Sequence, residues 1–409
     1  MNEQTKRILL IVGFILSVII IAIVMYRLFF AGFVPEATVH DTDETTTTTT
    51  TLPFSTDGVF DSTDGSTTDG SGVLTEADDV ANGSVTSTTT LTTGEVHNIA
   101  MNTDGSSVNY YDETDGRFYT IDEDGNVVRM SDTQFPDVDS VVWNKDAEKA
   151  VLEFPDGSNV IYNFDSEQQV TLPQHWEDFD FSPVDDEIIA KSIGLDPANR
   201  WLLTANDDGS NIKSFQALGE NEEKVDVNWS PNDQVVAFAD TAGSAYGGLN
   251  RTMIYPVGLN DENFKGLVVE GLDFMSLWSP NGKQLLYSVV GDYSDSKPLL
   301  WIVDATASTM GENRRSLGLN TWVDKCTWGS SSMVYCAVPQ DLPANAGLQR
   351  SLFDQLPDVL YSINFNSGRT SLLAIPEEET AMTNLSVSSD ESKLYYTNDS
   401  GQLELILLK

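Results

Sequence analysis

The stretch that decides the fold is residues 229–240, which read Trp-Ser-Pro-Asn-Asp followed by Gln-Val-Val-Ala-Phe-Ala-Asp. Residues 278–289 repeat it as Trp-Ser-Pro-Asn-Gly and Lys-Gln-Leu-Leu-Tyr-Ser-Val, and residues 181–192 as Phe-Ser-Pro-Val-Asp and Asp-Glu-Ile-Ile-Ala-Lys-Ser. Pro followed by Asn-Asp or Asn-Gly is typical of a tight turn. The alternating apolar residues after the turn predict a β-strand. Each copy therefore reads as an aromatic anchor, a turn and a strand.

The same pattern recurs more loosely at four other places in the chain. Together the copies give seven anchors, which are Met101, Trp143, Phe181, Trp229, Trp278, Trp328 and Val387. Repeats of about 40–50 residues are typical of the blades of a β-propeller, in which each blade is a four-stranded sheet. The sequence therefore predicts an all-β propeller of seven blades, with six or eight as alternatives. We expect the anchors to be structural and to pack between neighbouring blades.

A third apolar strand follows in every repeat, and a fourth follows in the first six. The seventh repeat ends at Lys409 after its third strand, which would leave a sheet edge open. The Thr- and Val-rich stretch 85–91, just before the first repeat, favours a strand. We expect it to supply the missing strand and to close the ring.

The Trp-Ser-Pro-Asn-Asp/Gly units resemble the PD40 (WD40-like) repeats of TolB-type propellers, over roughly residues 96–409. TolB itself has six blades and an added N-terminal domain, whereas this chain shows seven repeats and no such domain. The resemblance therefore implies a propeller with a protein or glycan partner, and it does not imply TolB's particular function.

An apolar run at residues 8–33 precedes all of these repeats. No residue between Ile8 and Met25 is charged, and a membrane-spanning helix needs about 20 apolar residues. Lys6 and Arg7 precede the run, so the positive-inside rule places residues 1–7 in the cytoplasm and the rest outside. A cleaved signal peptide is the alternative, but its apolar region would be shorter. We expect a single-pass signal anchor and an extracytoplasmic C-terminal domain.

Residues 34–84 are rich in Thr, Asp, Gly and Ser, with an unbroken Thr run at 45–51. Such a stretch buries too little apolar surface to offset the entropy of ordering it. We interpret it as a disordered stalk between the membrane helix and the propeller at 85–409. The acidic turns within it lack the ligand spacing of an EF-hand loop, so we assign them no calcium site.

The net charge of the chain is −41, of which −31 falls in residues 96–409. Nucleic acids and anionic lipid surfaces are disfavoured as partners, because both are bound through clusters of Lys and Arg. A cationic partner is compatible with this charge.

Catalytic signatures are weak in this chain. The nucleophile motif Gly-x-Ser-x-Gly is not found, and the nearest match, residues 243–247, lacks the central Ser. The three histidines, His40, His97 and His175, are too few for a His-rich metal site. We therefore predict no catalytic residues, no metal and no cofactor, although the many carboxylates leave a glycosidase-like acid pair open.

Cys326 and Cys336 flank a turn in the sixth repeat, where a bulged hairpin would place them opposite each other. Disulfides persist outside the cytoplasm, so we predict a bond between them, with two buried thiols as the alternative.

Three functions fit these features. The first is a tethered module that binds a protein or glycan at a propeller face. The second is a carbohydrate-active enzyme that uses carboxylates at the channel mouth. The third is a structural subunit of an envelope complex, which the lack of a GxxxG motif in residues 8–33 weakly disfavours. Carboxylates that converge in a concave pocket would favour the enzyme.

Overall fold

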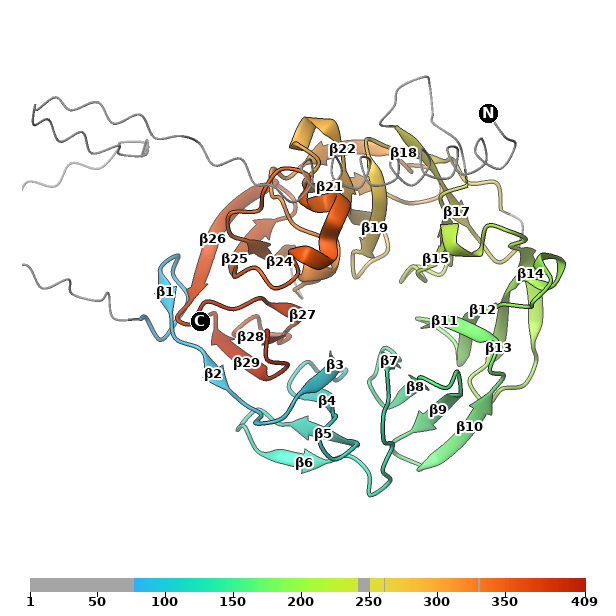
Figure 1. Cartoon of the computed structure of the whole chain (residues 1–409), viewed down its shortest axis with the longest axis horizontal. Helices are drawn as coiled ribbons and strands as arrows, with labels where there is room; N and C mark the ends of the chain where they lie inside the picture. Colours follow the sequence, from blue (N-terminus) through green and yellow to red (C-terminus); the bar gives the residue numbers. More distant parts are fainter. Residues whose placement is uncertain (1–76, 242–250, 261, 330–331) are drawn as a thin grey trace, which may run out of the picture. The chain divides into compact units, whose positions relative to one another are not determined.

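The computed structural model describes residues 77–241, 251–260, 262–329 and 332–409. Within these ranges the chain forms seven sheets, arranged one after another in a ring (Figure 1). Each sheet contains four antiparallel strands, and one of them has a fifth, parallel strand at its edge. The prediction of a seven-bladed all-β propeller is therefore confirmed. Each of the first six blades is built from four consecutive strands, and the innermost strand comes first in the chain.

The strands of the first three blades are as follows. Blade 1 contains β3 (Val96–Met101), β4 (Val108–Asp112), β5 (Arg117–Ile121) and β6 (Val127–Arg129). Blade 2 contains β7 (Ser140–Trp143), β8 (Lys149–Glu153), β9 (Asn159–Asn163) and β10 (Gln168–Leu172). Blade 3 contains β11 (Trp176–Phe181), β12 (Glu187–Ser192), β13 (Trp201–Asn206) and β14 (Lys213–Ala217).

The other four blades follow the same order. Blade 4 contains β15 (Val225–Val227), β16 (Ala237–Ala239), β17 (Thr252–Val257) and β18 (Leu267–Val269). Blade 5 contains β19 (Leu272–Trp278), β20 (Gln284–Val290), β21 (Pro298–Asp304) and β22 (Glu312–Ser316). Blade 6 contains β23 (Cys326–Trp328), β24 (Met333–Pro339), β25 (Asp358–Asn364) and β26 (Arg369–Pro376). Blade 7 contains β27 (Thr383–Val387), β28 (Lys393–Thr397), β29 (Leu403–Leu407) and β2 (Thr89–Thr90).

The repeated turn joins the first strand of each blade to the second. In blade 4, the Ser230 hydroxyl accepts hydrogen bonds from the backbone N–H groups of Gln234 (3.1 Å) and Val235 (2.9 Å). Asp233 takes a left-handed backbone conformation with φ of 58°, and Gly282 occupies the same place in blade 5 with φ of 62°. Asp and Gly both tolerate this conformation, which explains the Asn-Asp and Asn-Gly pairs of the repeat.

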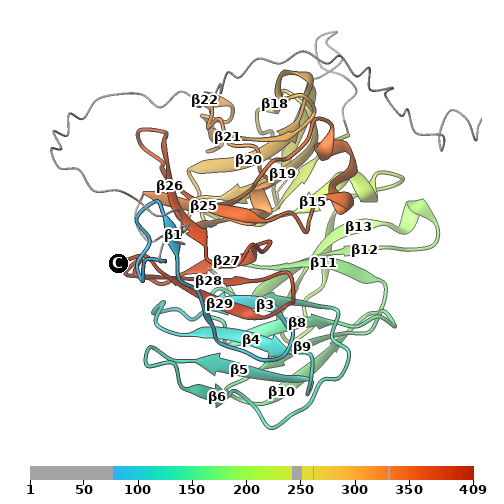
Figure 2. The ribbon, with the colours of Figure 1, turned by 60° about the vertical axis from the view of Figure 1, so that its left-hand side comes forward.

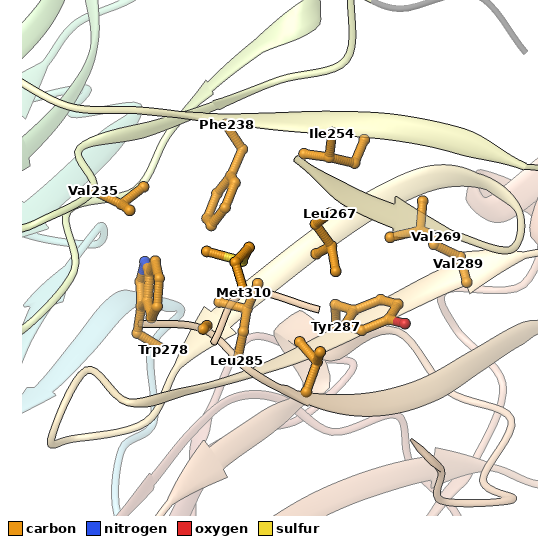
Figure 3. Close-up of a cluster of buried hydrophobic side chains, with 12 residues drawn as sticks. Val235, Phe238, Ile254, Leu267, Val269, Trp278, Leu285, Tyr287, Val289 and Met310 are labelled. Carbon is orange, nitrogen blue, oxygen red and sulfur yellow. The ribbon is translucent and has the colours of Figure 1, made fainter. Parts of the chain in front are cut away.

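The anchors lie at the ends of the innermost strands, or just after the end in the case of Trp229, and they pack between blades. Trp278 of blade 5 stacks on Phe238 of blade 4, with ring centroids 5.5 Å apart, and its indole N–H donates to the backbone carbonyl of Asn228 (3.2 Å). Figure 3 shows this cluster, in which Leu285 and Tyr287 of blade 5 face the side chains of blade 4. The buried apolar surface between neighbouring blades is therefore the core of the domain.

The segment before the first repeat closes the ring. Strand β2 pairs antiparallel with β29, so that Thr89 lies opposite Leu405 and Thr90 opposite Glu404. The predicted stretch 85–91 thus supplies the fourth strand of blade 7, but it does so with its second half only. Its first half, β1 (Val85–Thr86), pairs parallel with β26 and extends blade 6 (Figure 2).

The ring has two faces, which we call the turn face and the loop face. The turn face carries the repeated turns between the first and second strands of each blade. The loop face carries the turns between the second and third strands and the connections from one blade to the next. The long insertion 340–357 of blade 6 lies on the loop face, because it joins β24 to β25.

The described ranges contain no helix long and apolar enough to cross a membrane. The predicted membrane segment at 8–33 and most of the predicted stalk at 34–84, up to residue 76, lie outside the described residues.

Candidate ligand site on the loop face

Four innermost strands carry the same irregularity close to the loop face. The pairing register shifts in β3, β11, β19 and β27, between the first strand and the second of the blade. In each case an Asn or Asp takes a left-handed conformation at the bulge: Asn98, Asp178, Asp273 and Asn384. A bulge re-aims side chains and is frequent beside functional sites.

Five carboxylates follow one another along the loop-face ends of four adjacent blades. We call this set the acidic arc, and its members are Glu153 of β8, Glu177 and Asp178 of β11, Asp226 of β15 and Asp273 of β19. The second strands run towards the loop face and the innermost strands start from it. Residues at the end of β8 and near the starts of β11, β15 and β19 therefore lie at the same end of the ring.

Part of the acidic arc opens into a cavity of about 350 Å³ between blades 3, 4 and 5. Asp178, Asp226 and Asp273 line it together with Asp240, which follows β16. Its apolar wall includes Phe274 and the interblade residues Phe238 and Ile254. Carboxylates from three blades thus converge on one concave, partly apolar surface.

Lys191 is the buried cation of this cavity. It lies on β12 opposite Glu177, its side chain is only 6% exposed, and it forms an ion pair with Asp178. A buried ammonium group needs such a partner, because an unpaired charge is costly to remove from water. A second cation, Lys224, lines the cavity as well and acts on Asp240. Because five acidic side chains line the cavity, an excess of negative charge remains.

Asp226 has the most strongly perturbed pKa in this cavity. Its carboxylate is open to the cavity, but the surrounding protein atoms strip away much of its hydration, which raises its pKa to about 6. Repulsion from Asp178 adds to this effect, and Lys191 opposes it. Asp226 therefore changes charge near neutral pH.

The other members of the arc repel one another as well. Loss of hydration raises the pKa of Glu153 and of Glu177, and in both cases Asp178 is the next largest cause. The pKa of Asp273 is raised by loss of hydration, while Arg350 opposes that change. Carboxyl groups with raised pKa values that line a concave surface mark a candidate functional site.

Arg350 extends the charge pattern to blade 6. It lies in the insertion 340–357, its guanidinium group stacks 4.9 Å from the ring centroid of Trp322, and it pairs with Asp324 (2.5 Å) and Asp354 (3.0 Å). A planar guanidinium suits both the stacking and the pairing. The insertion is therefore fixed against the loop face.

The structure also places the residues that the sequence singled out. Cys326 and Cys336 lie opposite each other on β23 and β24 and form the predicted disulfide. His175 is exposed beside the buried Trp176, as expected for a loop residue, whereas His40 lies outside the described residues. His97 lies on β3 close to two glutamates.

No residue of the acidic arc was predicted from the sequence. The sequence nonetheless contained a signal. In five repeats an Asp or Asn lies three to five positions before the anchor and is followed directly by an apolar residue. These pairs are Asn98-Ile99, Asp178-Phe179, Asp226-Val227, Asp273-Phe274 and Asn384-Leu385. Among 63 acidic residues this spacing would have selected Asp178, Asp226 and Asp273.

No family model and no curated protein matches this chain. Solved structures do match. An oligogalacturonate lyase in complex with manganese has a TM-score of 0.55 at 13% identity, over 79% of this chain and 93% of that one. An oligogalacturonate lyase from Vibrio parahaemolyticus has a TM-score of 0.53 at 12% identity, over 78% and 92%. TolB from Acinetobacter baumannii has a TM-score of 0.42 at 14% identity, over 69% and 65%.

At these identities the matches show the fold. The chain is a β-propeller protein, as its repeats predicted, and the two oligogalacturonate lyase structures share this fold.

Proposed function

We propose that this chain is a membrane-tethered, extracytoplasmic binding module whose propeller holds a positively charged protein segment on its loop face. The acidic arc carries the proposal. It presents several carboxylates from adjacent blades around a cavity of about 350 Å³, and the two lysines that line this cavity, Lys191 and Lys224, do not balance them. A Lys or Arg side chain of a partner would supply the missing charge, and its aliphatic stem would suit the wall formed by Phe274.

The charge of the domain favours a basic protein segment over a glycan. Residues 96–409 carry −31, so a cationic partner is steered towards the domain from a distance. Most glycans are neutral or anionic and gain nothing from this field. The rigid ring supports the loops, as is usual for binding surfaces on propellers.

Two features support the tether and the extracytoplasmic location. Residues 8–25 are uncharged and follow Lys6 and Arg7, which favours an anchor with its N-terminus inside. The Cys326–Cys336 disulfide suits an oxidising compartment. Protease treatment of intact cells tests this location: digestion of the propeller is expected, whereas full protection until the membrane is broken would contradict it.

Binding is tested by titrating the full chain, purified in a mild detergent, with a fluorescent hexalysine peptide. The double substitution D226N/D273N is expected to weaken binding at least tenfold. The matched control is D124N/D208N, which removes the same charge from exposed turns outside the arc. If the two variants bind hexalysine equally well, binding depends only on the overall charge, and the assignment of the site to the acidic arc is wrong. If a chitosan oligosaccharide, which carries amino groups, binds and the peptide does not, the partner is a cationic glycan and not a protein segment.

A carbohydrate-active enzyme is the second candidate, and the converging carboxylates favour it. Asp226, with a pKa of about 6, has the property of a general acid, and Asp178, which pairs with Lys191 in the same cavity, would be the second carboxyl group of such a site. Release of reducing ends from a panel of polysaccharides tests it. If the native chain cleaves a polysaccharide and D226N does not, the chain is an enzyme. If the chain binds hexalysine and cleaves no polysaccharide, the binding module is supported.

A further inference from the structure

The hairpin of β3 and β4 gathers a histidine and two glutamates on one face. Val96 lies opposite Asp112 and His97 opposite Tyr111, and the backbone N–H of Glu113 donates to the carbonyl of Glu95 (3.0 Å). Glu95 and Glu113 are therefore cross-strand neighbours. His97 is two residues beyond Glu95, so its side chain emerges on the same face.

The ligand atoms of these three side chains are already close together. One nitrogen or oxygen from each of Glu95, His97 and Glu113 lies within 4.8 Å of the other two. His97 Nε2 is 2.9 Å from Glu113 Oε2. Ligand atoms bound to one tetrahedral zinc ion lie about 3.3 Å apart, as follows from metal–ligand distances of about 2.0–2.1 Å. Small side-chain rotations would bring all three atoms to that spacing.

Without a cation the arrangement is electrostatically unfavourable. Two carboxylates directly opposite each other on neighbouring strands repel, and Glu95 and Glu113 have this relationship. Both glutamates are exposed, and on one side the Glu95 side chain packs against the backbone of Gly401, where an added Cβ would lie 2.3 Å from Glu95 Cγ. Gly401 thus limits the directions that Glu95 can take on the side of blade 7.

We propose that Glu95, His97 and Glu113 bind a divalent transition-metal ion of the zinc type. One imidazole and two carboxylates suit zinc or manganese, whereas calcium and magnesium prefer oxygen ligands alone. Three protein ligands leave one position for water, which is the composition of an open metal site.

The open side of this site is shared with a second cavity of the loop face. Glu95 and His97 line a cavity of about 350 Å³ together with Arg350, Asp354 and Asn384. A ligand oxygen could reach the metal from this cavity. The three ligands belong to blade 1, whereas the acidic arc lies on blades 2 to 5. The metal site can therefore be confirmed or refuted independently of the proposed function.

The experiment is a zinc titration of the full chain in detergent, followed by calorimetry and thermal unfolding. Excess Mg²⁺ in the buffer occupies the non-specific acidic surface. We expect one zinc ion per chain and a rise in Tm with zinc. Substitution of Co²⁺ should give the visible absorption band of a site with a nitrogen ligand. The variants H97A and E95Q/E113Q should each lose binding at least tenfold.

The matched controls are H175A and H40A, which remove the other two histidines, and E148Q, which removes an exposed glutamate elsewhere. All three should bind zinc as the native chain does. Zinc binding that survives in H97A, or that is lost in H175A or H40A, would place the metal elsewhere and overturn the proposal. Failure of the native chain to bind zinc or Co²⁺ would overturn it as well. Circular dichroism shows whether each variant is folded.

Discussion

Lys325 Nζ lies 2.6 Å from Asp358 Oδ2, and neither side chain reaches solvent. The same carboxylate oxygen accepts a hydrogen bond from the backbone N–H of Met382 (2.7 Å). Lys325 precedes the innermost strand of blade 6, and Met382 precedes that of blade 7. This buried ion pair therefore joins two blades at the loop face.

Removal of Lys325 alone is expected to destabilise the domain strongly. The variant K325M leaves Asp358 buried without its cation, and breaking a buried pair in this way costs about 3–5 kcal/mol. The double variant K325M/D358L should recover most of this loss, because no buried charge remains. Urea unfolding monitored by tryptophan fluorescence measures both variants. The control R129A breaks an exposed pair with Asp132 and should cost less than about 1 kcal/mol.

The pH dependence of K325M follows from the pKa of Asp358. Burial raises this pKa and Lys325 opposes the change, so its removal raises the pKa further. A carboxyl group whose pKa is raised in the folded state binds its proton more tightly there, and its stabilising effect is lost as pH rises. K325M should therefore be least impaired in acid, and equal destabilisation at pH 5 and pH 8 would contradict this.

The Cys326–Cys336 disulfide is expected to stabilise the propeller modestly. It closes a short loop, since the two residues are 10 apart in the sequence, and a loop of that size gives about 2–3 kcal/mol in the chain-entropy model. Reduction, or the double variant C326S/C336S, should lower Tm by several degrees without unfolding the domain at room temperature. If reductant lowers the Tm of C326S/C336S as much as that of the native chain, the disulfide is not the cause.

Deletion of residues 85–91 should destabilise the whole domain. It removes β1 and β2, and with them the pairing to β26 and β29 and the hydrogen bond from Leu91 N–H to the Leu403 carbonyl (2.8 Å). Blade 7 would then have only three strands and an open edge. Thermal unfolding should show a loss of at least 10 °C. Deletion of residues 45–51, which have the same length, is the control and should leave Tm unchanged.

Binding of a cationic ligand should strengthen as pH rises through 6. The pKa of Asp226 is about 6, so its carboxyl group is mostly neutral at pH 5 and mostly ionised at pH 7. Hexalysine affinity measured between pH 5 and pH 7.5 should increase severalfold in the native chain. D226N should flatten this profile. An unchanged profile in D226N would show that other groups cause the pH dependence.

The same pKa has the opposite effect on folding. Because the pKa of Asp226 is raised in the folded state, its contribution is most favourable below about pH 4 and is lost as pH rises through 6. D226N removes the ionisable group, so its stability relative to the native chain should improve between pH 5 and pH 7. Denaturant unfolding at both pH values checks the sign.

The sequence by itself predicted seven blades, with six or eight as alternatives, and anchors that pack between them. The turn residues Pro231, Asp233 and Gly282 and the alternating apolar strands are local signals, since each depends on a few neighbouring residues. The disulfide was also predictable, because its two cysteines face each other across a single hairpin. Features that depend only on residues close together in the sequence can be predicted without knowing the rest of the fold.

Only the tertiary structure decided which carboxylates act together. Glu153, Asp178, Asp226 and Asp273 come from four different blades. Three of them lie three to five positions before an anchor, but this spacing does not show that they meet at one face of the ring. The ring brings the ends of their strands to one face, and the pKa of Asp226 is raised by loss of hydration there and, to a smaller extent, by Asp178, nearly 50 residues away in the sequence. The same holds for the splitting of residues 85–91 between two blades, because pairing partners more than 280 residues distant set that register. Charge crowding, loss of hydration and long-range strand pairing depend on distances in space, which the folded ring alone establishes.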